Sequence, residues 1–180
     1  NELRYHWEDQ KYNFSSGLTV PTNVWSHVAL VVTPTQARLY LNGRVATNTS
    51  THNVVNFVQP FNFGVDPTSD ARTFIGHMDE ICIYDRALST TEIRELMHLT
   101  KNPIDDNSLK AYYQFNTPDP LTDIDKAGTN NILLNLGAAK IKSTVPVGKG
   151  LSQTLAVNTS GLKHFNLTDL KMYFPSSGPY

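Results

Sequence analysis

Apolar and polar residues alternate over short runs in the first part of the chain, which predicts β-strands. The run 24–32 is rich in β-branched and aromatic residues and is flanked by prolines, so it predicts a central strand. The run 37–41 predicts a second strand, and Asn42-Gly43 directly after it predicts a type I′ hairpin turn, because both residues tolerate positive φ. The chain is then expected to return as a third strand over 44–47.

Further strands are indicated where similar runs lie between Pro, Gly, Asn or Asp clusters, at 3–7, 54–58, 62–65 and 73–84. A single helix is predicted after them. Ser89 can cap its first turn, Glu92 completes a Ser-x-x-Glu capping box, and Ile93, Leu96 and Met97 form an apolar stripe that should end near His98.

A polar stretch at 101–108, which contains Pro103, predicts a boundary near residue 104. We therefore expect a first domain over 1–103 and a second β-rich segment, a spacer or the start of another β-domain, over 104–180. The second segment opens with an apolar and aromatic strand at 109–115. Further strands are indicated at 132–136, 138–141, 154–157 and 170–174.

Composition narrows the function. The formal net charge is -1 and only 17% of residues are charged, so the charge of the chain does not favour binding to nucleic acid or to an anionic surface.

No window approaches the roughly 18 apolar residues of a membrane span, and the chain opens without a signal peptide, so we interpret its start as internal. One cysteine, Cys82, excludes an intrachain disulfide, and its apolar neighbours predict a buried, unreactive thiol.

Four motifs occur in order along the first hundred residues: Trp25-Ser26-His27-Val28-Ala29, Arg38-Leu39-Tyr40-Leu41-Asn42-Gly43, Ile75-Gly76-His77-Met78-Asp79-Glu80-Ile81 and Tyr84-Asp85-Arg86-Ala87-Leu88-Ser89. Together they resemble the laminin-G-like, concanavalin A-like lectin and glucanase jelly-roll superfamily. The resemblance implies an all-β, antiparallel sandwich with one short helix. It also implies a module that binds glycans or proteins, often with calcium, in a secreted or cell-surface protein.

A whole domain of that family begins several strands earlier, so the resemblance implies that the N-terminal strands are missing here. An incomplete sandwich exposes sheet edges, which invite pairing with another chain or segment, and 109–115 is a candidate to fill one gap. Residues 111–116, with Asp123 and Gly128, resemble the opening of another such unit or a spacer in bacterial surface proteins. Residues 146–152 resemble the spacer, and both options remain open.

Candidate chemistry is sparse. The superfamily's glucanases place acidic residues as Glu-x-Asp-x-x-Glu along one strand, a pattern that Asp79-Glu80 does not reproduce. Adjacent strand residues point to opposite faces, so we expect no catalytic dyad and a turn-stabilising role for Asp79. The six histidines lack metal-ligand spacing, and no Gly-x-Ser-x-Gly elbow is present.

Calcium is the one metal that the sequence supports. In pentraxins, a branch of the superfamily, an acidic loop before the Phe-x-Gly strand supplies calcium ligands, and Asp66 and Asp70 lie comparably before Phe74. Two carboxylates alone are too few to hold calcium, so a solvated turn is the favoured interpretation and a calcium site the alternative. Tyr5, Trp7 and Tyr12 are the candidate aromatic residues for stacking on sugar rings, whereas Trp25 is expected in the core.

The sequence thus predicts a non-catalytic, carbohydrate- or protein-binding adhesion module of a secreted or cell-surface multidomain protein. Its expected partners are a glycan or an extracellular protein, together with neighbouring domains of the same or a partner chain. A structural spacer or secretion-system cargo fragment is the alternative, and a glucanase ranks last.

Overall fold

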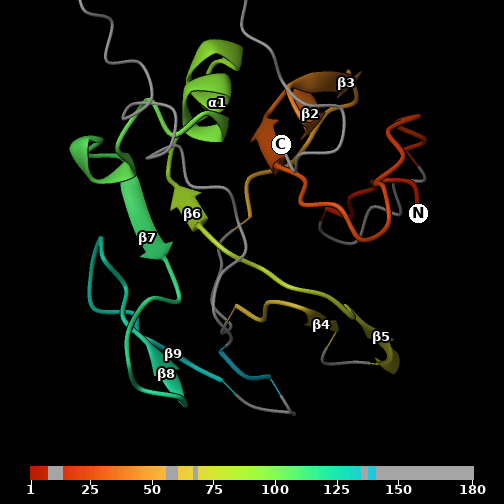
Figure 1. Ribbon diagram of the computed structural model, residues 1–180. Helices are drawn as coiled ribbons and strands as arrows, with labels where there is room; N and C mark the ends of the chain where they lie inside the picture. The colour runs from red at the N-terminus through yellow and green to blue at the C-terminus, as the bar shows by residue number, and fades with distance from the viewer. Residues whose placement is uncertain (8–13, 56–60, 67–68, 135–137, 141–180) are drawn as a thin grey trace, which may run out of the picture.

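A computed structural model describes residues 1–7, 14–55, 61–66, 69–134 and 138–140 (Figure 1). Every strand pair in this part of the chain is antiparallel, and one short α-helix accompanies the strands, in agreement with the predicted fold class. The elements are β1 Val28–Thr33, β2 Gln36–Leu41, β3 Arg44–Asn48, β4 Val65–Asp66, β5 Ser69–Thr73, β6 Ile81–Tyr84, α1 Thr90–Met97, the 3-10 helix η1 Pro103–Asp105, β7 Leu109–Tyr113, β8 Thr122–Asp123 and β9 Ile132–Leu133. No helix in the described part has the length and apolar content that crossing a membrane requires.

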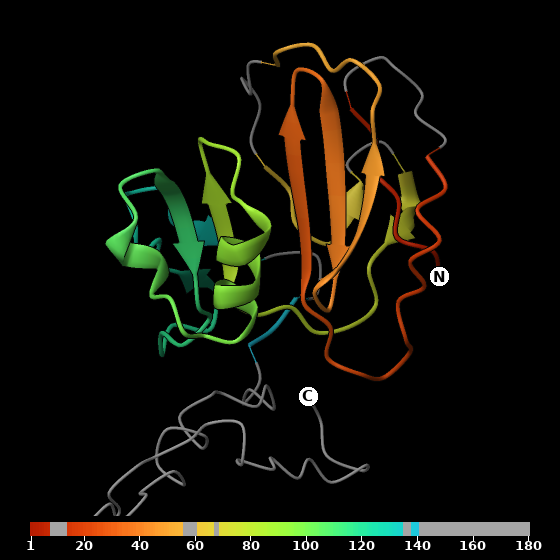
Figure 2. The same ribbon diagram turned by 90° about the horizontal axis from the view of Figure 1, so that it is seen from above.

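Strands β1, β2 and β3 form a three-stranded meander, seen face-on in Figure 2. The turn between β2 and β3 is of the predicted type, since Asn42 and Gly43 have φ values of 48° and 76°. Asn42 also ties this turn to the start of β1. Its backbone N–H donates to the carbonyl of His27 over 2.9 Å, and its side-chain oxygen accepts from the N–H of His27 over 2.8 Å. The first strand therefore begins at Val28, later than predicted.

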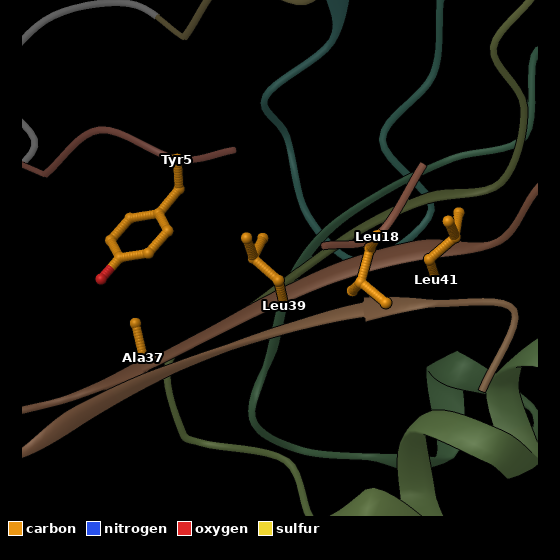
Figure 3. Packing of buried hydrophobic residues seen from close by; sticks show 5 residues of the cluster. All are labelled: Tyr5, Leu18, Ala37, Leu39 and Leu41. Atoms are coloured by element: carbon orange, nitrogen blue, oxygen red, sulfur yellow. The ribbon is translucent and has the colours of Figure 1, made fainter. Parts of the chain in front are cut away.

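The two faces of this sheet are covered by different parts of the chain, because alternate residues of β2 point to opposite sides. Ala37, Leu39 and Leu41 pack with Tyr5 and Leu18 of the N-terminal segment in the cluster drawn in Figure 3. Tyr40 lies on the opposite face, in a second cluster of buried residues made of Val31, Tyr40, Leu88 and Ile93. Figure 3 shows the helix on the side of the strands away from the first cluster.

Helix α1 begins as predicted. The Ser89 hydroxyl accepts a hydrogen bond from the N–H of Glu92 over 3.2 Å, and the Glu92 carboxylate accepts from the N–H of Ser89 over 2.8 Å. Both halves of the capping box are present. Ile93 is buried against the sheet, and the helix ends at Met97 with His98 as its C-cap, which confirms the predicted end.

Strand β7 pairs with β6, so a strand that follows residue 104 pairs with one that precedes it (Figure 1). The register places Ile83 opposite Ala111 and Ile81 opposite Tyr113. The stretch between the two strands is held by ion pairs: Arg86 contacts Glu92 and Asp106, each over 2.5 Å, and Lys101 contacts Glu92 over 3.2 Å and Asp106 over 3.0 Å. The division into 1–103 and 104–180 stays a prediction, but the expected linker contains a 3-10 helix and a buried Pro103.

Several strand predictions require correction. Residues 3–7 form no strand, and Glu2 makes one isolated bridge to Thr19. The run 73–84 is divided into the end of β5 and β6, with 74–80 in neither. Two features accompany this interruption: the N–H of Phe74 donates to the carbonyl of the distant residue Gly64 over 2.7 Å, and Glu80 has a left-handed φ of 53°, which an extended strand does not adopt.

The other predicted runs are shorter in the structure or lie beyond it. Only Val65 of 62–65 and only 132–133 of the described residues 132–134 belong to strands, and residues 54–55 and 138–140 belong to none. The remainder of 54–58, residues 135–136, residue 141, and the predicted strands at 154–157 and 170–174 lie outside the described residues.

Candidate functional site

The connection between β5 and β6 presents apolar side chains to solvent. Phe74, Ile75 and Met78 are 54%, 96% and 38% exposed. Two glycines let these side chains lie close to the backbone. A Cβ added at Gly76 would lie 2.6 Å from the Phe74 ring, and one added at Gly64 would lie 3.3 Å from the Met78 methyl group.

Trp25, just before β1, extends this apolar region. Its ring centroid lies 6.1 Å from that of the exposed His77, with the two planes inclined by 37°. The expectation that Trp25 belongs to the core is therefore wrong, since it is half-buried and lies beside a surface loop. We call Trp25, Phe74, Ile75, His77 and Met78 the 74–78 surface. Clustered exposed apolar groups are typical of binding sites rather than of inert protein surface.

The described aromatic residues that were candidates for stacking on sugars are buried or half-buried in the structure. Tyr5 is only 8% exposed, and its hydroxyl is hydrogen-bonded to His52 and Asn48, each over 2.7 Å, so it is a core residue. Trp7 is half-buried and donates from Nε1 to the carbonyl of Asn53 over 2.9 Å. Tyr12 lies outside the described residues.

Asp66 and Asp70, the predicted calcium ligands, lie on one hairpin. Asp66 ends β4 with a half-buried side chain, and Asp70 belongs to β5, whose Ser69 pairs with Asp66 after a shift in register. The fold thus brings the two positions to the same turn. Within the described residues, no group of three or more His, Cys, Asp or Glu side chains is arranged to hold a metal ion.

The histidines are spread over the molecule, as their spacing indicated. His52 is buried, His27 is half-buried, and the remaining described ones are exposed; they are His6, His77 and His98. His164 lies outside the described residues. The pKa of His27 is lowered, first because burial disfavours the charged imidazole and second because His98 repels it.

A catalytic dyad of Asp79 and Glu80 was not expected because adjacent strand residues point to opposite faces. That reason does not apply, since both residues lie before β6 and not within a strand. The Asp79 carboxylate accepts from the N–H of Glu80 over 2.9 Å, the turn-stabilising contact expected of it. Glu80 accepts a short hydrogen bond from the hydroxyl of Tyr112, and Gln114 donates to that hydroxyl over 2.8 Å. Burial raises the pKa of Glu80, and the charge of Asp79 adds to this, while the Tyr112 hydrogen bond opposes it.

Cys82 follows on β6, opposite Tyr112. Burial raises the pKa of its thiol to about 12, and the nearby charge of Glu80 acts in the same direction. A raised pKa makes a thiol a weaker nucleophile at neutral pH, and Cys82 is half-buried where full burial was predicted.

Two buried carboxylates in the second segment were not recognised as a site from the sequence. Asp125 is 3% exposed and accepts from three backbone N–H groups: that of Tyr112 over 2.9 Å, that of Ala127 over 2.9 Å and that of Asn130 over 3.3 Å. These contacts hold a loop against β7. The Asp-x-Asp pattern in an Asn- and Gly-rich run was the available signal.

Asp123 is 1% exposed and is paired with Lys140 over 2.9 Å. It also accepts from the N–H of Phe115 over 2.9 Å and from the hydroxyl of Thr117 over 2.7 Å. Burial alone would raise the pKa of Asp123, but the hydrogen bonds from Lys140, Thr117 and Phe115 lower it overall. With its oxygens occupied by donors from this chain, Asp123 stabilises the loop and offers no open ligand position.

A family model described as the concanavalin A-like lectin/glucanases superfamily matches residues 1–94. No curated protein matches the chain. Among solved structures, the chain is similar to a crystal structure of part of an S-layer domain-containing protein from Clostridium thermocellum, with 28% sequence identity and a TM-score of 0.41. The match covers 46% of this chain and 43% of that chain, so the chain spans less than half of that structure.

Proposed function

Because the chain belongs to the concanavalin A-like lectin/glucanases superfamily through residues 1–94, we propose that it is a non-catalytic binding module of a secreted or cell-surface multidomain protein. Its ligand is an extracellular protein or a glycan, and the 74–78 surface is the place of contact. One observation supports this assignment above others: Ile75 is 96% exposed and Phe74 54% exposed beside the Trp25–His77 ring contact.

The composition of this surface favours a protein partner. Aromatic residues and methionine are enriched in protein interfaces, and an exposed isoleucine gains most from burial against another apolar surface. A glycan is the second candidate, because the Trp25 ring is half-buried beside His77 and the apolar face of a sugar can stack on an indole.

Calcium binding is a further part of the proposal, with Asp66 and Asp70 as ligands. The two residues lie on paired strands of one hairpin, close to its turn, and carboxylates are donors that calcium prefers. Two carboxylates bind weakly unless carbonyl oxygens or water complete the coordination, so only weak affinity is expected. Titration calorimetry with millimolar calcium should detect heat of binding, and calcium should raise the melting temperature. If neither effect is seen, calcium is not part of the function.

Two alternatives have specific support. A spacer role is favoured by the β6–β7 pairing and the ion pairs of Arg86, because these contacts stabilise the chain without any ligand. A glucanase is favoured only by the raised pKa of Glu80, and its carboxylate is already bonded to Tyr112. Turnover of soluble β-glucans by the full chain would establish the glucanase.

The binding proposal is tested with the full chain and matched surface variants. Ile75→Asp and Trp25→Ala change the 74–78 surface, and Val45→Asp changes a side chain that is 46% exposed on β3. Binding is measured on a glycan array and by titration against extracellular proteins recovered by pull-down, after melting curves show that all variants are folded.

We expect the first two variants to lose at least about tenfold in affinity, while Val45→Asp binds like the unchanged chain. Ile75→Asp buries a charge in an apolar contact, which is costly, and Trp25→Ala removes an aromatic contact. Equal affinity of all variants would place the binding site elsewhere. No binding to either class of ligand would favour the spacer.

A further inference from the structure

Strand β1 is an edge of the three-stranded sheet, because the described strands pair in the order β1-β2-β3. The N–H of Asn42 donates to the carbonyl of His27, so this pair belongs to the hydrogen-bonded positions of the ladder. Such positions alternate in antiparallel sheets. It follows that the N–H and C=O groups of Val28, Leu30 and Val32 point away from β2, toward the open edge.

The side chains of the same residues lie on the face of the first cluster. The register places Val28 opposite Leu41 and Leu30 opposite Leu39. Leu39 and Leu41 are only 3% and 4% exposed, whereas Leu30 and Val28 are 44% and 52% exposed. The N-terminal segment therefore covers the apolar face over β2, and Val32 also packs against this cluster, whereas Val28 and Leu30 of β1 stay exposed.

The edge also lacks the usual protection against pairing. Exposed edge strands commonly carry charged residues, prolines or bulges that block the approach of another strand. All six residues of β1, Val-Ala-Leu-Val-Val-Thr, are uncharged, and none is proline or glycine. At the other edge of the sheet, β3 begins with Arg44 and ends with polar Thr47 and Asn48.

From these observations we propose that a second copy of this chain adds to the open edge, with β1 of one copy antiparallel to β1 of the other. This register is self-complementary: Leu30 of one copy lies opposite Leu30 of the other, and Val28 lies opposite Val32. All outward-pointing backbone groups of these residues then find partners. A continuous sheet with two-fold symmetry results, in which the exposed Val28 and Leu30 side chains are buried.

A second copy fits this edge better than a charged peptide. Val28, Leu30 and Val32 offer apolar side chains and neutral backbone groups at this edge, which β1 itself matches in length and in alternation. The chain has a formal net charge of -1, so repulsion between two copies is small. The proposal uses β1 alone and does not depend on ligand binding at the 74–78 surface.

The oligomeric state of the full chain tests the proposal, measured by sedimentation and light scattering over a wide range of concentration. We expect a dimer that dissociates on dilution. Leu30→Lys places a charge at the centre of the interface and should weaken the dimer by at least about tenfold. Val45→Lys places the same charge at a position on β3 with similar exposure, 46% against 44%, and should leave the dimer intact.

The register has its own readout. Opposed hydrogen-bonded residues in antiparallel strands have Cα atoms about 5.5 Å apart, within the range of a disulfide. In a Cys82→Ser background, Leu30→Cys should therefore form an intermolecular disulfide on oxidation, whereas Val45→Cys should not. A monomer at every concentration, a dimer unaffected by Leu30→Lys, or equal cross-linking at both positions would overturn the proposal.

Discussion

The hydroxyl of Tyr112 donates a hydrogen bond to the carboxylate of Glu80, and this contact joins the second segment of the chain to the first. Glu80 lies just before β6, and Tyr112 lies within β7. Burial raises the pKa of both groups. The contact is therefore part of a partly buried junction that spans the boundary indicated by the polar stretch at 101–108.

Replacing Glu80 by Gln is expected to increase the free energy of unfolding at neutral pH. Burial raises the folded-state pKa of Glu80 above its ordinary value of 4.5, so its protonated form favours folding. That contribution is fully present below the unfolded pKa and is lost as the pH rises through the folded pKa. Gln cannot ionise, and its amide oxygen can still accept from Tyr112.

Urea unfolding of both proteins at neutral pH and at about pH 4 measures this effect. The stability advantage of Glu80→Gln should be clear at neutral pH and should shrink at the lower pH. An advantage of the same size at both pH values would show that ionisation of Glu80 is not its cause.

Replacing Ser89 by Ala should destabilise the chain by about 1 kcal/mol, because the capping hydrogen bond to the N–H of Glu92 is lost. Thermal unfolding followed by circular dichroism should show a midpoint lowered by a few degrees. Thr91, exposed in the first turn of α1, supplies the control, since Thr91→Ala improves helix propensity without touching the cap. Equal melting of the two variants would contradict a stabilising role for the capping box.

Replacing Lys140 by Met should cost about 3 kcal/mol of stability, because it leaves the buried carboxylate of Asp123 without its cation. The loss stays at the low end for a broken buried pair, since Phe115 and Thr117 still donate to Asp123. Lys126→Met, at an exposed position in the same segment, serves as the control. Chemical denaturation measures the free energy of unfolding of both variants. Similar small decreases in the two would show that the ion pair contributes little to stability.

A disulfide across β6 and β7 should form if the two strands pair as described. Ile83 lies opposite Ala111, so Ile83→Cys combined with Ala111→Cys in a Cys82→Ser background should oxidise within one chain. After trypsin cleavage at Lys101, mass spectrometry should find the two peptides still linked under non-reducing conditions. Two separate peptides after oxidation would contradict the pairing.

The helix and the first hairpin were predictable because neighbouring residues determine them. Ser89 and Glu92 bond to each other within one turn, and Asn42-Gly43 adopts its two positive φ values with little help from the rest of the chain. Laminin-G-like membership was predictable for a similar reason, since its four motifs are contiguous runs. Such features need no knowledge of distant contacts.

Other features depend on contacts between distant residues and could not be derived from local patterns. The alternation over 73–84 predicted one strand, but the hydrogen bond from Phe74 to Gly64 and the left-handed φ of Glu80 interrupt it. The 74–78 surface arises from this interruption. Asp125 became recognisable only once the fold brought the N–H of Tyr112 to its carboxylate.

The position of β2 between two clusters of buried side chains has a consequence for how the chain opens. Ala37, Leu39 and Leu41 contribute to one cluster, while Tyr40 contributes to the other, and both ladders of the meander run through β2. Neither cluster can therefore loosen without disturbing the same six-residue strand. The amide protons of β2 should exchange with deuterium only through global unfolding, more slowly than those of the shorter strands β4, β8 and β9.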